Sequence, residues 1–146
     1  MGAHPWFYTV PYDGDISRAL SALTEREFRA GRYHPAERIP VFPVDPSHMP
    51  GCKHASIDAA RSAAGANGAR SILDMRKVGD RPDFGVVCAL DDEELEELFG
   101  SGRPSADEIL DSDELFEQIE RGQGVYVVAY EGNKPAQIIF AGYSYD

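Results

Sequence analysis

Three arginines, a tyrosine and a histidine follow one another closely near residue 30. Arg26 and Arg29 are three residues apart and share one face of an expected helix, and Arg32, Tyr33 and His34 come just after that helix should end. Guanidinium groups bind phosphates and carboxylates bidentately, so this cluster could clamp an anionic ligand. Two glutamates lie between the arginines, however, and the arginines could equally form ion pairs with the acidic second half of the chain.

The acidic residues are concentrated in the second half of the chain. Residues 1–70 hold 8 Lys/Arg and 7 Asp/Glu (+1), residues 71–146 hold 6 and 18 (−12), and the two sum to the net charge of −11. Residues 91–120 alone hold 13 acids and a single base. Such a surface repels nucleic acid and anionic membranes and attracts basic proteins, although it can also serve solubility alone. The candidate partner-binding residues are Asp91, Asp92, Glu93, Glu96, Glu97, Asp107, Asp111, Asp113, Glu114 and Glu117.

A third candidate site is the segment SHMPGCKH, which holds His48, Cys52 and His54. These are metal-ligand residue types, but a structural zinc site needs four ligands, and a second pair is missing. Cys52 as a nucleophile would need a base and an orienting group, and no catalytic-cysteine signature surrounds it. G-x-S-x-G, P-loop, G-x-G-x-x-G and H-E-x-x-H motifs are also missing. We therefore predict no catalytic residue, no metal site and no cofactor.

The elements that position these residues can be outlined from the same patterns. Residues 34–50 hold five prolines, which excludes a helix or a central strand and predicts a long loop, often a functional feature. Proline at position 11 suggests that the first strand ends there or lies at a sheet edge. Capping boxes pair Asp91 with Glu94 and Ser105 with Glu108. The expected elements are strands over 6–12, 71–78 and 84–90, the last two paired antiparallel, and helices over 16–30 and 57–64 and from 91, 105 and 112.

The last twenty residues or so contain two apolar runs, GVYVVAY and PAQIIFAGY, joined by Glu131-Gly132-Asn133-Lys134. This pattern predicts a β-hairpin. Both alternating faces of the first run are apolar, so the hairpin should lie in the middle of a sheet with cover on both sides. Strands come in adjacent pairs and do not alternate with helices. We predict an α+β fold in a single domain (1–146): a mainly antiparallel sheet of about five strands, with helices packed on it and the C-terminal hairpin central.

The compartment can also be estimated from the sequence. The N-terminal residues lack the basic region and apolar core of a signal peptide, and no apolar run approaches the roughly 20 residues of a membrane span. Two cysteines are too few for a disulfide framework. These features predict a cytoplasmic protein without a membrane partner.

Five strings carry a resemblance to known proteins: YTVPY, EREFRAGRYHP, SILDM, ELFGSGRP and FAGYSYD. Together they resemble an uncharacterised small bacterial single-domain family, over most of the chain, and that resemblance implies no activity or site residues. In composition, an acidic α+β chain of this size is similar to the immunity proteins encoded beside bacterial toxins.

Two main hypotheses follow, beside a third in which the protein is an oligomeric structural module joined through its terminal strand. The first is a non-enzymatic acidic protein-binding module, of the immunity-inhibitor type, that covers a basic partner such as a toxin. The alternative is a small enzyme or anionic-ligand-binding domain that uses Arg26, Arg29, Arg32, Tyr33 and His34. The oligomeric state stays open in both.

Overall fold

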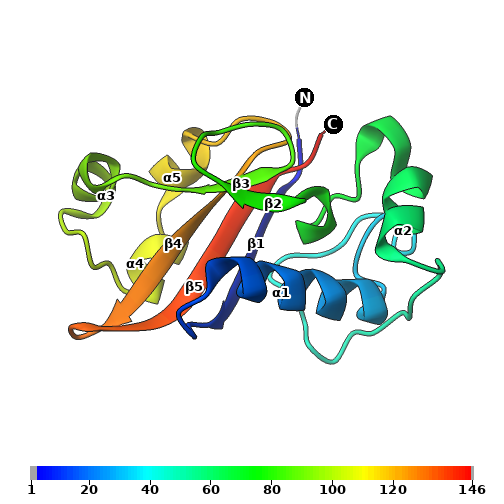
Figure 1. Cartoon of the computed structure of the whole chain (residues 1–146), viewed down its shortest axis with the longest axis horizontal. Coiled ribbons are helices and arrows are strands. Elements are labelled where there is room, and N and C mark those ends of the chain that lie inside the picture. Colours follow the sequence, from blue (N-terminus) through cyan, green and yellow to red (C-terminus); the bar gives the residue numbers. More distant parts are fainter. Residues whose placement is uncertain (1–2, 146) are drawn as a thin grey trace.

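A five-stranded sheet lies at the centre of the computed structural model, which describes residues 3–145, and helices cover both of its faces (Figure 1). This arrangement confirms the predicted α+β class. Within residues 3–145, no helix has the length and apolar character needed to cross a membrane. The strands are β1 (Pro5–Pro11), β2 (Lys77–Gly79), β3 (Val86–Ala89), β4 (Gly124–Glu131) and β5 (Lys134–Tyr143). The helices are α1 (Ile16–Ala30), α2 (Ile57–Ala64), α3 (Asp92–Phe99), α4 (Ala106–Leu110) and α5 (Asp113–Glu117), with 3₁₀ turns η1 (Gly65–Asn67) and η2 (Ile72–Asp74).

The C-terminal hairpin is central, as predicted. The strand order is β1-β5-β4-β3-β2, so β4 and β5 lie between β1 on one side and β3 on the other. β1 and β4 both pair antiparallel with β5. The prediction of a mainly antiparallel sheet is wrong, because β3 runs parallel to both β4 and β2. The sheet is therefore mixed, and the predicted antiparallel pairing of the segments 71–78 and 84–90 does not occur.

The error arises at residues 71–78, which were expected to form one strand. Ser71 accepts a hydrogen bond from the amide of Leu73 (3.2 Å) and starts the turn η2, in which Ile72 and Leu73 are fully buried. Only three residues remain for β2, which begins at Lys77. The apolar residues of this segment fill the core beneath α1 and do not extend a sheet ladder, which is how tertiary packing overrides strand propensity.

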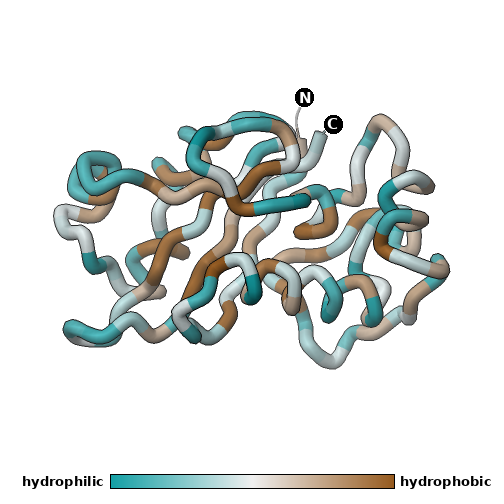
Figure 2. Tube along the Cα trace, in the orientation of Figure 1, coloured by the Kyte–Doolittle hydropathy of each residue, from teal (hydrophilic) through white to brown (hydrophobic). Residues whose placement is uncertain are grey.

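Each face of the sheet carries its own core, as the two-sided pattern of the hairpin predicted. Figure 1 shows α3, α4 and α5 toward one end of the view, α2 at the other end and α1 below the strands, and Figure 2 shows hydrophobic stretches along the strands. The core on the α1 side includes Trp6, Tyr8, Leu23, Ile72, Leu73, Ile138 and Phe140. The core on the α3–α5 side includes Ile109, Leu115, Val125, Val127, Ala129, Ile139 and Ala141.

The end of α1 and the end of the proline-rich loop are fixed against each other. α1 is capped at its start by Asp15, whose side chain accepts a hydrogen bond from the amide of Arg18 (3.0 Å), and at its end by Gly31 in the left-handed conformation (φ 78°). A Cβ atom at residue 31 would overlap the carbonyl of Gly51, and the amide of Gly51 donates to the carbonyl of Ala30 (2.8 Å). The loop therefore returns to the point from which it leaves the helix.

We expect Gly142→Ala to destabilise the fold by about 1–3 kcal/mol, the usual cost of overpacking a core. A Cβ atom there would overlap the indole of buried Trp6 and approach the carbonyl oxygen of Gln123 to 2.6 Å. Gly102→Ala is the matched control, since nothing lies within 4 Å of its added Cβ atom. Urea denaturation of both variants measures the difference, and equal stabilities would contradict the packing described for Trp6.

Candidate functional site

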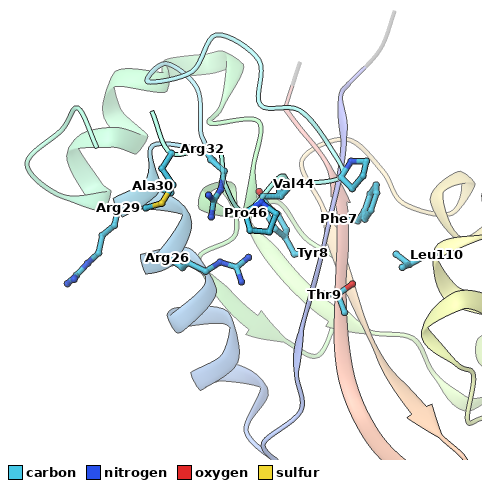
Figure 3. A pocket seen from close by; sticks show the side chains of 12 residues that line it. Phe7, Tyr8, Thr9, Arg26, Arg29, Ala30, Arg32, Val44, Pro46 and Leu110 are labelled. Atoms are coloured by element: carbon cyan, nitrogen blue, oxygen red, sulfur yellow. The ribbon is translucent and has the colours of Figure 1, made fainter. Parts of the chain in front are cut away.

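A pocket of about 580 Å³ lies along the free edge of β1, between α1, the proline-rich loop and the end of α4 (Figure 3). Its volume falls within the roughly 300–1,000 Å³ of typical ligand sites. Two large apolar side chains at its rim are exposed, Met49 by 65% and Leu110 by 39%. The lining residues are Phe7, Tyr8, Thr9, Arg26, Arg29, Ala30, Arg32, Pro43, Val44, Pro46, Met49 and Leu110. The site thus combines apolar walls with a cluster of arginines.

A buried ion pair forms the α1 side of this pocket. The carboxylate of Glu27 is fully buried and accepts hydrogen bonds from Nε (2.9 Å) and Nη2 (2.6 Å) of Arg32, which is itself 7% exposed. These bonds raise the pKa of Arg32 above its usual value. Nη1 of Arg32 donates to the carbonyl of His48 (3.0 Å), so the same guanidinium holds the loop against the helix end. Arg32 is consequently occupied by the fold itself.

Arg26 is the arginine best placed to contact a ligand. Its Nε donates to Glu27 (2.9 Å), and its side chain is 49% exposed. Figure 3 shows the guanidinium of Arg26 extending from α1 toward β1, whereas Arg29 points away from the pocket. Arg29 forms an exposed ion pair with Glu25 (2.6 Å). Within residues 3–145, no partner is seen for the two terminal nitrogens of Arg26, so they can bind an anion.

The floor of the pocket is neutral and aromatic. Tyr8 is buried, and its hydroxyl accepts a hydrogen bond from the amide of Ile72 (3.3 Å). Burial raises the pKa of Tyr8 well above its usual value, and the nearby carboxylate of Glu27 acts in the same direction. The ring of Phe42 packs against those of Tyr8 and Phe7, with distances of 5.2 Å and 6.3 Å between ring centroids. These contacts anchor the loop over one end of the pocket.

The structure does not bring the five residues of the predicted anion cluster together. Tyr33 is fully buried, and its ring stacks on that of Phe28 with 5.9 Å between the ring centroids. The hydroxyl of Tyr33 lies 2.7 Å from the Nδ1 atom of His54. The Nδ1 atom of His34 contacts the carbonyl of Arg38 within the loop (2.9 Å). Tyr33 and His34 therefore do not line the pocket. The sequence did not single out Tyr8, Val44, Met49 and Leu110, which come from β1, the proline-rich loop and α4, and only the edge signal of Pro11 pointed toward β1.

The ten candidate carboxylates of the acidic segment are all exposed. They lie on or next to α3, α4 and α5, which all pack on the same face of the sheet, opposite α1. Both predicted capping boxes are present, at Asp91 and at Ser105. Within residues 3–145, none of the ten forms an ion pair of 4 Å or less. Arg103, the one base of this segment, instead contacts Asn133 (3.2 Å) and the ring of Tyr130.

The side chains of the histidine and cysteine segment contact nearby parts of the chain. His48 contacts Glu37 through Nε2 (2.8 Å), and the thiol of Cys52 donates to the carbonyl of His54 (3.0 Å). Over residues 3–145, no three His, Cys, Asp or Glu side chains are grouped to hold a metal ion.

Comparison of the chain with protein-family models, with curated proteins and with solved structures finds no match. The family resemblance of the five sequence strings therefore stays a prediction.

We expect Glu27→Gln to lower the free energy of unfolding by about 3–5 kcal/mol, because it leaves the buried guanidinium of Arg32 without a counter-charge. Glu25→Gln, on the same helix, is the control: it removes an exposed pair with Arg29, worth about 0.3–0.5 kcal/mol. Chemical denaturation measures both. Similar losses in the two variants would contradict the structural role given to Glu27.

Proposed function

We propose that this protein is a non-enzymatic binding module whose acidic helices α3, α4 and α5 cover a basic surface on a protein partner, in the manner of an immunity-type inhibitor. The observation that carries the proposal is the placement of the ten candidate carboxylates. They are exposed, they gather on one face of the sheet, and no base of the described chain pairs with them. Charge held in this way is available to a partner.

α3 supports this role with apolar surface as well as charge. None of its residues is fully buried, and Leu95, Leu98 and Phe99 are only half-buried against the core. A half-buried aromatic and two leucines on the same helix as exposed carboxylates match the usual composition of an interface, in which apolar anchors lie within a polar rim. The carboxylates would speed association more than they add affinity.

Neutralising α3 should weaken partner binding by about tenfold or more, mostly through a slower association rate. The variant is Glu93→Gln/Glu96→Gln/Glu97→Gln, which spares the capping residues Asp91 and Glu94. The control is Asp58→Asn/Asp80→Asn/Glu131→Gln, which changes the charge equally at exposed sites outside α3, α4 and α5.

The measurement has two stages. Affinity capture from the cells that make the protein, at low salt, identifies a basic partner, and stopped-flow mixing of the purified pair then gives association rates over a range of salt. Binding should weaken as salt rises. Failure to capture any basic protein, or equal association rates for both triple variants, would reject the acidic surface as the docking site.

A second candidate function is the binding of an anionic ligand in the pocket beside β1. The exposed guanidinium of Arg26, which points into a pocket with largely apolar walls, favours it. A carboxylate or phosphate attached to an apolar group would suit both features.

We expect a thermal-shift screen of phosphorylated and carboxylated metabolites to give a stabilising ligand whose effect is lost in Arg26→Gln and kept in Arg29→Gln. Arg32 is unsuitable for this test, because its replacement would break the buried pair with Glu27. A hit that both variants retain would place the ligand outside this pocket, and the absence of any hit would reject this candidate.

A further inference from the structure

The free edge of β1 opens into the pocket. The amide of Tyr12 donates to the carbonyl of Ala136 (3.1 Å) and that of Ser144 to the carbonyl of His4 (3.0 Å), so the even-numbered residues direct their backbone groups toward β5. In an antiparallel ladder, the odd-numbered residues then direct theirs outward. The outward groups belong to Pro5, Phe7, Thr9 and Pro11.

Little of this edge is available to another strand. Proline has no amide hydrogen, so Pro5 and Pro11 offer only carbonyls at the two ends of β1. Phe42 contacts the rings of both Phe7 and Tyr8 and so crosses the edge there. Thr9 remains, exposed and lining the pocket, and among the described residues no hydrogen bond to its outward amide or carbonyl is seen. The open part of the edge is thus short, and it lies within the pocket.

We propose that this groove binds a short extended peptide segment, in which acidic and apolar residues alternate, as an additional strand beside Thr9. The proposal rests on the anion-binding role of Arg26 and specifies the anion as a side-chain carboxylate of that peptide. A main-chain pairing of this kind supplies affinity through backbone hydrogen bonds and specificity through alternate side chains. The peptide residue opposite Thr9 would exchange two hydrogen bonds with it.

The alternation follows from the two walls of the groove. Side chains of successive strand residues point to opposite faces of the sheet. The side chains of the even-numbered residues of β1 face α1, as that of Tyr8 does. Those of the odd-numbered residues face α4 and α5, as shown by Phe7, whose ring packs against that of Phe116 with 6.3 Å between the ring centroids. A peptide residue opposite Thr9 therefore points toward Leu110 and α4, and both of its neighbours point toward α1 and Arg26. Because Asp107 lies within α4 and Asp111 directly follows it, that wall favours an apolar residue over an acidic one.

The shortness of the edge also selects the kind of occupant. Joining two sheets edge to edge needs a longer run of paired residues than the prolines and the loop leave open. A second copy of this chain is therefore a poor fit, and a flexible segment of about three to five residues is a good one, at about 3.4 Å per residue along the groove.

The test uses the full-length protein and a terminally blocked peptide, Ser-Thr-Glu-Leu-Glu-Thr-Ser, labelled for fluorescence anisotropy. We expect binding, with a shift of the Thr9 amide in the ¹H–¹⁵N NMR spectrum. A peptide with both glutamates replaced by glutamine should bind to the unchanged protein about tenfold more weakly. The intact peptide should bind to the Arg26→Gln variant about tenfold more weakly too, because each change removes one charge-assisted hydrogen bond. Combining the two changes should add little, because they remove the same contact. Arg29→Gln is the control and should bind normally.

The backbone pairing is tested separately. A peptide with N-methylleucine lacks the amide that would donate to the carbonyl of Thr9, and it should not bind. Thr9→Pro should also abolish binding without disturbing the β5 ladder, whereas Thr9→Val should retain it; thermal unfolding checks that both variants fold. Equal binding of the methylated peptide, or an unshifted Thr9 amide, would overturn the proposal.

The outcomes separate this inference from the one on which it rests. If inorganic phosphate or citrate stabilises the protein in a manner that depends on Arg26 but no peptide binds, the anion site holds and the peptide inference is wrong. If neither small anions nor peptides bind, both are wrong.

Discussion

The arrangement around the pocket depends on one buried carboxylate, that of Glu27. A desolvated carboxylate costs several kcal/mol unless its charge is paired and its lone pairs are hydrogen-bonded. Arg32 provides a two-pronged bond and Arg26 a third hydrogen bond, so the charge is fully compensated. The consequence reaches beyond the pair, because Arg32 also holds the loop through the carbonyl of His48. A single charge thus fixes the helix end, the course of the loop and the direction of the remaining nitrogens of Arg26.

The central hairpin explains why the two charged regions of the chain stay apart. β4 and β5 bury side chains on both faces, so each face needs its own cover of helices. α1 supplies one cover, and its Arg26 and Arg29 pair with glutamates of the same helix, Glu27 and Glu25. α3, α4 and α5 supply the other, with carboxylates directed to solvent. The arginines therefore do not neutralise the acidic segment, and the asymmetry of charge seen in the sequence persists in the fold.

The structural features that depend on neighbouring residues could be predicted from the sequence, and those that depend on tertiary packing could not. The extent of α1 and α2, the cap at Gly31 and both capping boxes depend on residues within one or two turns. The burial of Glu27 and Tyr33 depends on what packs above them, and an interleaved Glu and Arg pattern looks the same on an exposed helix. The parallel pairing of β2 could not be foreseen either, since η2 takes residues that carry strand-like side chains. The groove combines residues from four distant segments. The sequence pointed to the arginines of α1, to the proline-rich loop and, through Pro11, to the edge of β1, but nothing in it indicated that α4 would join them.

Net charge is a poor guide to what such a groove can bind. The chain carries −11 overall, which would argue against any anionic ligand. Exposed charges more than about 8–10 Å away are largely screened at physiological salt, however, so nearby groups decide. On the α1 wall these are Arg26 and Arg32, with one of the two positive charges balanced by Glu27. On the α4 wall the nearest charged residues in the sequence are acidic. The groove is consequently polarised across its width, which favours a ligand that presents a negative group to the α1 wall and an apolar group to the α4 wall.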